Sequence, residues 1–312
     1  MFDLDTIKKL REAGKIAGQV RREGAKKLAV SGASHLEVMD FCEKRIKELG
    51  GEIAWAQMAV NKVAAHYCPT AEETAVTKEG DVIKIDVGVH KEGWIADNAM
   101  TVEVGRTDAK LNNKNGDYAD LIKAAKNALK AALKIAKPGT KLWELGEAQL
   151  SETEALGFTT IKNLSGHTLG QYRVHGGVSI PTYNTKEKTE LEEGWQVAIE
   201  PFATDGDGLI KAKGDSTIFM QSRDAGVRSP YAKKILQDIK QHNGMPFTTR
   251  WLTRKFGKGA TALGMRELLR SNIVRDYPPL VEVAGGMVSQ FEHSLIVKDK
   301  PEVYTRHEDD SW

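Results

Sequence analysis

The sequence predicts an α/β domain with pseudo-twofold symmetry, in which strands from two related halves form one sheet and helices cover one of its faces. The first observation is a weak internal repeat, because Gly32 falls on Gly139 at an offset of 107 residues. The second is that each half runs as helix, helix and then apolar strands. The third is that Asp86 and Glu200 each stand six residues after the glycine of a Glu-Gly pair. Acids from related strands should therefore meet at the centre of the sheet.

Composition indicates a globular protein. The 312 residues suffice for one large domain or two ordinary ones, and the formal net charge is only +2. Two cysteines, Cys42 and Cys68, fit a reducing compartment and exclude a disulfide-rich design. The chain has neither an apolar run of 18 residues nor an apolar segment after its N-terminus. We therefore expect a cytoplasmic protein.

Four amphipathic segments are predicted to form the helices. Each segment carries apolar residues at helical spacing on one side and charged residues on the other. Ser34 and Glu37 form a capping box at the start of the second segment. Gly50 ends the second segment and its repeat partner Gly157 ends the fourth. The predicted helices span residues 5–30, 34–49, 118–136 and 141–156.

Residues 81–102, DVIKIDVGVHKEGWIADNAMTV, are predicted to form a β-hairpin around which the chain is organised. Asp86 and Asp97 interrupt its apolar pattern, one on each arm, and we expect them to face each other within about one residue of register. Two ionised carboxylates held together in a buried strand repel each other, so a proton or a cation should lie between them. The alternative, two solvated loop acids, is disfavoured because both arms are otherwise apolar.

A basic segment is predicted near the C-terminal end. Residues 222–282 carry 12 Lys and Arg against 5 Asp and Glu, a net charge of +7, which leaves −5 for the rest of the chain. Short helical patterns occur within this segment. We expect residues 1–221 and 283–312 to form the main domain and residues 222–282 a helical insertion. A single strand over residues 287–297 should then return to the main sheet.

The acids and histidines that interrupt apolar strands suggest a metal site. Four carboxylates and one imidazole suit two divalent ions such as Mn, Co, Fe or Zn, and four negative charges match two such cations. The alternative is that each polar residue is paired locally, which becomes less plausible for five residues on related strands. The five candidate ligands are Asp86, Asp97, His167, Glu200 and Glu292.

Two further histidines are predicted to flank this site. His66 and His175 are separated by 109 residues, which is close to the repeat offset. They are expected to lie on either side of the metal ions. The alternative for His175 is a structural role, with its ring bonded to a backbone carbonyl.

At these residues the chain resembles the methionine aminopeptidases of type II, in their short archaeal-like form. The resemblance covers nearly the whole chain, and its segments follow the order found in that family. It implies the pita-bread fold and a small, winged-helix-like insertion before the last ligand strand. The matching segments are AAHYCPT, KIDVGVHKEGWIADNAMTV, NLSGHTLGQYRVHGGVSIP, AIEPFAT and SQFEHSLIV.

The resemblance also implies a role for each candidate residue. Asp86 would hold one metal ion, His167 and Glu200 the other, and Asp97 and Glu292 would bridge the two. Glu200 would act as the general base towards the attacking water. His66 and His175 would contact the substrate amide and stabilise the tetrahedral oxyanion. The reaction would remove the N-terminal methionine from nascent proteins and peptides whose second residue is small.

Ala54-Trp55 departs from the family pattern, which usually has Phe-Pro before the position of His66. Ala54 removes an aromatic side chain from the wall of the methionine pocket. Trp55 is expected to supply an aromatic side chain to this wall from the next position.

Two alternative functions remain at this point. A prolidase or X-Pro aminopeptidase would share the five ligands, but it normally carries an additional N-terminal domain. A non-enzymatic nucleic-acid-binding or ribosome-binding relative would normally lack metal ligands. We expect a monomer acting on nascent-chain N-termini without membrane contact. The basic insertion is either a ribosome-contacting surface or simply a solvated helical face.

Overall fold

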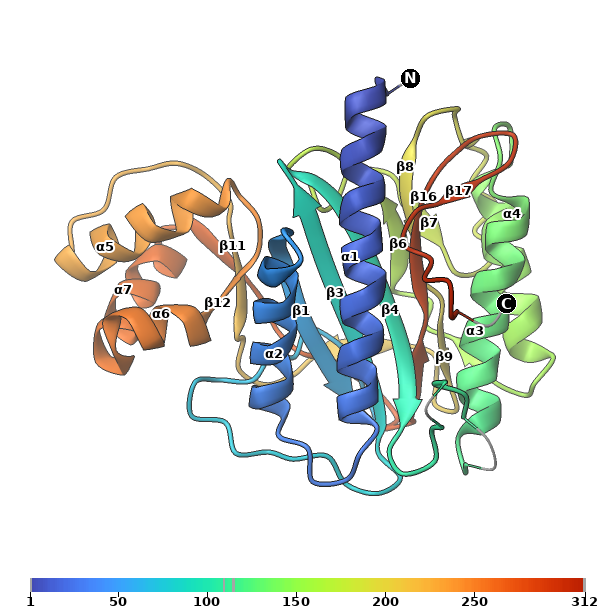
Figure 1. The fold of residues 1–312 in the computed structure, drawn as a ribbon, viewed down its shortest axis with the longest axis horizontal. Helices are drawn as coiled ribbons and strands as arrows, with labels where there is room; N and C mark the ends of the chain where they lie inside the picture. The colour runs from blue at the N-terminus through green and yellow to red at the C-terminus, as the bar shows by residue number, and fades with distance from the viewer. Residues whose placement is uncertain (1, 109, 114–115, 311–312) are drawn as a thin grey trace.

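A central antiparallel sheet of eight strands organises the protein (Figure 1). The computed structural model describes residues 2–108, 110–113 and 116–310. The strand order is β1-β3-β4-β16-β8-β6-β7, and β17 pairs with β16. The strands are β1 (Glu52–Val60), β3 (Val82–Lys91), β4 (Trp94–Glu103), β6 (Ser165–Thr168), β7 (Ser179–Pro181), β8 (Gln196–Ile199), β16 (Glu292–Ile296) and β17 (Glu302–Val303).

Four helices cover one face of this sheet, as the sequence predicts (Figure 1). They are α1 (Leu4–Leu28), α2 (His35–Glu48), α3 (Ala119–Ile135) and α4 (Leu142–Glu154). Local chemistry determines where they begin, since the Asp3 carboxylate accepts a hydrogen bond from the Thr6 N–H and the Ser34 hydroxyl accepts one from the Glu37 N–H. No helix among the described residues is long and apolar enough to span a membrane.

The internal repeat is visible in the backbone hydrogen bonds. The Gly32 N–H donates to the Thr77 carbonyl at 2.8 Å, and the Gly139 N–H donates to the Leu191 carbonyl at 2.9 Å. Both glycines have positive φ angles, +84° and +82°, which a residue with a side chain adopts only with strain. The same turn therefore positions the second helix of each half, and the predicted pseudo-twofold domain is confirmed.

A second hydrophobic core lies in a separate unit of helices and a small sheet. Its residues run from Phe219 to Val274, and Figure 1 shows the unit beside the main sheet. We propose that this unit is the insertion expected at residues 222–282, between the two parts of the main domain, 1–221 and 283–312. Its strands and helices run from Ile218 to Tyr277, so it begins four residues before the expected boundary. Its elements are β11 (Ile218–Gln221), α5 (Pro230–Ile239), η1 (Lys240–His242), β12 (Phe247–Thr248), α6 (Thr249–Phe256), α7 (Lys258–Arg270) and β13 (Val274–Tyr277).

The prediction of one strand over residues 287–297 is wrong. Phe291 separates β15 (Val288–Gln290) from β16, and the two strands belong to different sheets. Strand β15 pairs with β9, whereas β16 pairs with β4 and β8. An apolar run does not reveal a change of partner, because both halves of this run are buried. The remaining strands are β2 (Val63–Ala65), β5 (Thr159–Thr160), β9 (Phe202–Thr204), β10 (Ile210–Ala212) and β14 (Leu280–Glu282).

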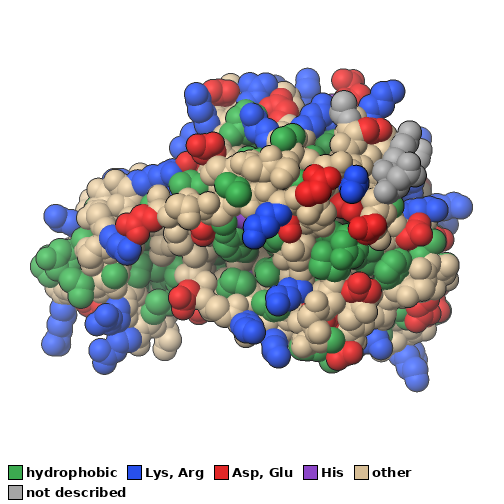
Figure 2. Space-filling model, turned by 90° about the horizontal axis from the view of Figure 1, so that it is seen from below, with side chains coloured by type: hydrophobic (Ala, Val, Ile, Leu, Met, Phe, Trp, Pro, Cys, Tyr) green, Lys and Arg blue, Asp and Glu red, His purple; other side chains and the backbone are tan. Residues whose placement is uncertain are grey.

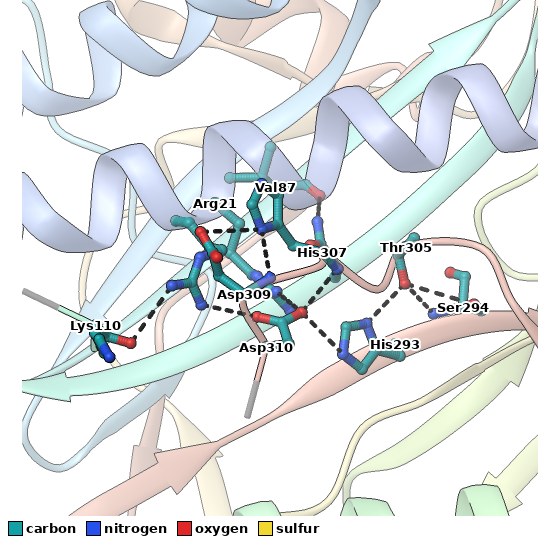
Figure 3. A network of polar contacts seen from close by, with 11 residues as sticks. Arg21, Val87, Lys110, His293, Ser294, Thr305, His307, Asp309 and Asp310 are labelled. Carbon is teal, nitrogen blue, oxygen red and sulfur yellow. Dashed lines mark hydrogen bonds and ion pairs between the residues drawn. The ribbon is translucent and has the colours of Figure 1, made fainter. Parts of the chain in front are cut away.

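The C-terminal segment ties α1 to the helix-covered side of β16 through a buried polar network (Figure 3). The Asp310 carboxylate accepts hydrogen bonds from Arg21 at 2.6 Å and Arg22 at 3.0 Å. The Thr305 hydroxyl accepts a hydrogen bond from the Ser294 N–H at 3.0 Å and lies 2.8 Å from His293 Nδ1. The network therefore holds the strand that carries Glu292 from behind.

We expect Asp310→Asn to lower the free energy of unfolding at pH 7 by about 3–5 kcal/mol, because two buried guanidinium groups lose their counter-charge. Burial raises the pKa of Asp310, but the charges of Arg21 and His293 outweigh this effect and hold the pKa below its ordinary value. The stabilisation is therefore present above the unfolded-state pKa near 4 and should be lost as the pH falls below it.

Urea titrations of the parent and the variant at several pH values measure this difference. Asp309→Asn is the matched control, since its carboxylate is 64% exposed and lies 3.7 Å from His307 Nδ1. The control should change the free energy of unfolding by less than about 1 kcal/mol. Equal effects of the two substitutions would contradict the role of Asp310.

Candidate metal centre and active site

Two neighbouring rows of residues run across the sheet and carry the candidate ligands. In the first row Gln57 pairs with Asp86, Asp86 with Ala99, and Ala99 with Glu292. Glu200 directly follows the end of β8, the strand that pairs with β16. The rows lie two residues apart along the strands, so their side chains share one face of the sheet.

The second row contains the other candidate ligands. Trp55 pairs with Gly88, and Gly88 pairs with Asp97. At the far end of this part of the sheet, His167 pairs with Ala198. Gly88 and Ala198 are small, as Ala99 is in the first row, so the charged side chains converge over positions that fill little space.

The register of the hairpin differs from the prediction. Asp86 lies opposite Ala99 and Asp97 opposite Gly88, so the two aspartates are diagonal neighbours two residues apart rather than directly opposed. The hairpin turn is formed by Glu92 and Gly93, since Lys91 pairs with Trp94. The diagonal keeps both side chains on the same face. Such diagonal residues are typically about 7–8 Å apart, which leaves room for a cation between their carboxylates.

A cavity of about 340 Å³ lies over the two rows. Both the sheet and the insertion line it, and the insertion side includes Met220, Pro246 and Tyr277. All five candidate ligands and both flanking histidines border the same cavity: Asp86, Asp97, His167, Glu200, Glu292, His66 and His175. The structure thus brings together every site residue that the sequence singles out.

The centre of the cluster fits a divalent cation. Asp97, His167 and Glu292 each offer a ligand atom, and these three atoms lie within 4.8 Å of one another. His167 Nε2 is 3.7 Å from Asp97 Oδ2 and 3.6 Å from Glu200 Oε1. Asp97 Oδ1 and Glu292 Oε1 are buried and have no hydrogen-bond partner among the described residues. Unpaired buried carboxylate oxygens are costly, and a bound cation would remove that cost.

The proton affinities of the cluster agree with this interpretation. Burial, followed by the charges of the neighbouring carboxylates, raises the pKa of Asp97 and Glu292 well above its ordinary value. Burial and the charge of Asp86 raise the pKa of Glu200 in the same way. Burial lowers the pKa of His167 to about 3, so its imidazole is neutral at physiological pH and suited to metal binding.

Asp86 is held differently from the other carboxylates. The Trp55 indole N–H donates to Asp86 Oδ1 at 2.7 Å, and the Gln57 amide donates to Oδ2 at 2.7 Å. Trp55 is expected from the sequence to form a pocket wall. The structure places it at the cavity and also bonds it to a predicted ligand. The sequence pattern does not single out Gln57, although its position two residues after Trp55 puts both side chains on one face of a strand.

The two flanking histidines both line the cavity, and each ring packs against a different aromatic neighbour. His66 has a positive φ of +65°, and its ring lies edge-to-face against Tyr277 with centroids 5.4 Å apart. Burial lowers the pKa of His66 to about 4. The His175 ring lies 4.7 Å from that of His167, and burial also lowers its pKa. Both rings are therefore neutral at physiological pH, and each carries one N–H.

Comparison with known proteins agrees with this geometry. The metallopeptidase family M24 matches residues 8–230. The chain belongs to the M24 metallopeptidases. It is 46% identical over 303 residues to a methionine aminopeptidase of Pyrococcus horikoshii, covering 96% of this chain and 99% of that protein. It is 32% identical to methionine aminopeptidase 2 of Komagataella phaffii, covering 96% of this chain and 69% of that protein.

Solved M24-type structures share the fold. A thermophilic Arx1 superimposes with a TM-score of 0.87 at 17% identity, covering 100% of this chain and 93% of that one. Methionine aminopeptidase from Thermotoga maritima superimposes with a TM-score of 0.70 at 23% identity, covering 98% of each chain. The predicted pita-bread fold is confirmed, and the full-length relatives place this M24 chain among the methionine aminopeptidases rather than the prolidases. Divalent metal use follows from membership of this metallopeptidase family.

Proposed function

We propose that this protein removes the N-terminal methionine from nascent proteins and peptides whose second residue is small. The observation that carries the proposal is the convergence of four carboxylates and one neutral imidazole on the floor of a cavity that a peptide N-terminus can enter. Near full-length similarity to methionine aminopeptidases supports it. The expected setting is the cytoplasm, and the expected state is a monomer.

The five residues are proposed to hold two divalent ions, Co, Mn, Fe or Zn. Asp86 would bind one ion, His167 and Glu200 the other, and Asp97 and Glu292 would lie between them. When bound, the ions supply an activated water and polarise the scissile carbonyl. The charges of four carboxylates and two divalent cations cancel, which removes the repulsion that raises the carboxyl pKa values in the metal-free protein.

Glu200 is the proposed general base. Its Oε2 accepts a hydrogen bond from the Gln290 amide at 3.3 Å, which leaves Oε1 to face His167 at the centre of the site. There Glu200 would take the proton of the attacking water and pass it to the departing amine. His66 and His175, both neutral, would donate hydrogen bonds to the substrate amide and to the oxyanion that forms from its carbonyl.

The apolar wall of the cavity is the proposed pocket for the methionine side chain. Aliphatic and aromatic residues from both the main domain and the insertion form this wall, and an unbranched apolar side chain fits such a surface. The wall includes Trp55, Leu164, Val178, Phe202, Ile218 and Met220. The second residue of the substrate would lie towards the cavity mouth, where space limits it to a small side chain.

The basic insertion is the proposed contact with the ribosome. Lys and Arg side chains project from this unit at the left of Figure 2, and Lys233, Lys234 and Arg266 are exposed. We expect co-sedimentation with ribosomes that weakens steeply with salt. Lys233→Glu with Lys234→Glu should reduce it, whereas Lys8→Glu on α1, whose side chain is 73% exposed, should not. Sedimentation that does not depend on salt would contradict the proposal that this surface contacts the ribosome. Equal effects of the double substitution and of Lys8→Glu would contradict it as well.

Replacing either flanking histidine should separate chemistry from metal binding. His66→Ala and His175→Ala are each expected to lower kcat by about 10²-fold or more, since each removes one donor to the oxyanion. Metal content, measured by elemental analysis, should remain that of the parent. Loss of metal in either variant would make that residue a ligand and contradict its assigned role.

Methionine release tests the proposed function directly. Protein reconstituted with Mn²⁺ or Co²⁺ should release methionine from Met-Ala-Ser, and metal-stripped protein should not. Norleucine should stay close to methionine and leucine should fall behind by ~10–200-fold in kcat/KM, the range for a poorly filled apolar pocket. Equal rates for leucine and methionine, or preferential cleavage of an X-Pro peptide, would overturn the methionine specificity.

A further inference from the structure

Asp86 differs from the other carboxylates of the cluster in how its oxygens are bonded. Each of its two oxygens accepts a hydrogen bond of 2.7 Å from a side-chain donor. Asp97 and Glu292 each retain a buried oxygen without a hydrogen-bond partner among the described residues. In the described part of the chain, Glu200 has a single side-chain hydrogen-bond donor, Gln290, at 3.3 Å. Asp86 is therefore the carboxylate of the cluster whose orientation is most constrained.

The sheet itself presents the two donors to Asp86. Gln57 lies directly opposite Asp86 in the pairing of β1 with β3, and Trp55 lies opposite Gly88. The indole ring packs flat over Gly88, where an added Cβ would come within 2.4 Å of two ring atoms. Gly88 thus lets the indole lie low enough for its N–H to reach the neighbouring aspartate.

The chemistry of the donors suits a metal ligand. An ionised carboxylate offers about four lone-pair sites on its two oxygens, so two donors leave others open toward the cavity. Both donors are neutral, and they orient the carboxylate without cancelling the charge that attracts a cation. A lysine or arginine in either place would compete with the metal for that charge.

We propose that Trp55 and Gln57 are positioning residues that hold Asp86 in the orientation needed to bind its metal ion. The inference rests on the proposed two-metal centre. It gives the Ala54-Trp55 departure from the family pattern a function, because tryptophan supplies a side-chain N–H that neither phenylalanine nor proline has. Partners that orient a metal ligand typically contribute a factor of about 10–100 to metal affinity. The effect should fall on the ion held by Asp86.

Calorimetric titration of the metal-free protein with Mn²⁺ tests this inference. The parent should bind two equivalents. Trp55→Phe keeps the ring but removes its N–H, and Gln57→Met keeps the length but removes the donor. Each variant, and the double variant more strongly, should weaken one equivalent about 10–100-fold and leave the other unchanged. Gln290→Met is the matched contrast, because it removes the hydrogen-bond donor to Glu200. It should weaken binding of the other Mn²⁺ ion, the one that Glu200 is proposed to hold.

The possible results separate the inference from the function on which it depends. If the double variant binds two equivalents of Mn²⁺ with the affinities of the parent, the positioning role is overturned and the two-metal centre stays intact. A parent that binds fewer than two equivalents would overturn the centre itself, and the positioning role with it. Thermal unfolding of the metal-free variants is recorded alongside, and a weakening that spreads equally over both equivalents together with a lower Tm would assign these residues to folding instead.

Discussion

Repulsion among four carboxylates on one face of a sheet is the constraint on which the rest of the structure depends. In a buried site each of these charges is expensive, and together they favour a swollen or protonated site unless cations are bound. The fold brings them together because their strands are neighbours, and small residues such as Gly88 and Ala99 leave space between them. The same arrangement that destabilises the metal-free site suits it to binding divalent cations.

Strand β16 has a central position in this arrangement. Successive residues of a strand face opposite sides, so Glu292 faces the cavity and His293 faces the helices and the C-terminal segment. The network of Thr305 and Asp310 therefore supports the strand from behind while its front face carries a proposed ligand (Figure 3). A close approach on α1 makes this possible, since a Cβ at Gly14 would lie 2.1 Å from the Tyr304 carbonyl oxygen.

The insertion completes the cavity from the side. A buried arginine attaches it to the main domain, because Arg250 donates to the Pro69 carbonyl at 2.9 Å and to Cys68 Sγ at 3.1 Å, and also pairs with Glu43. Tyr277, at the end of β13, is thereby held against His66. A segment that has its own hydrophobic core thus contributes to the shape of the cavity.

The sequence by itself determined the helices and the pseudo-twofold plan, and it singled out the candidate site residues that the structure places around one cavity. Helical periodicity, glycines at positive φ and acids stranded in apolar segments are local signals, and the signal that singles out Asp86, Asp97, His167, Glu200 and Glu292 does not depend on knowing which strands pair. Only the tertiary structure decided the register of Asp86 with Ala99, the break at Phe291 and the bonding of Gln57 to Asp86. Each of these depends on which strand lies beside which, and strand pairing is set by contacts distant in sequence that a one-dimensional pattern does not encode.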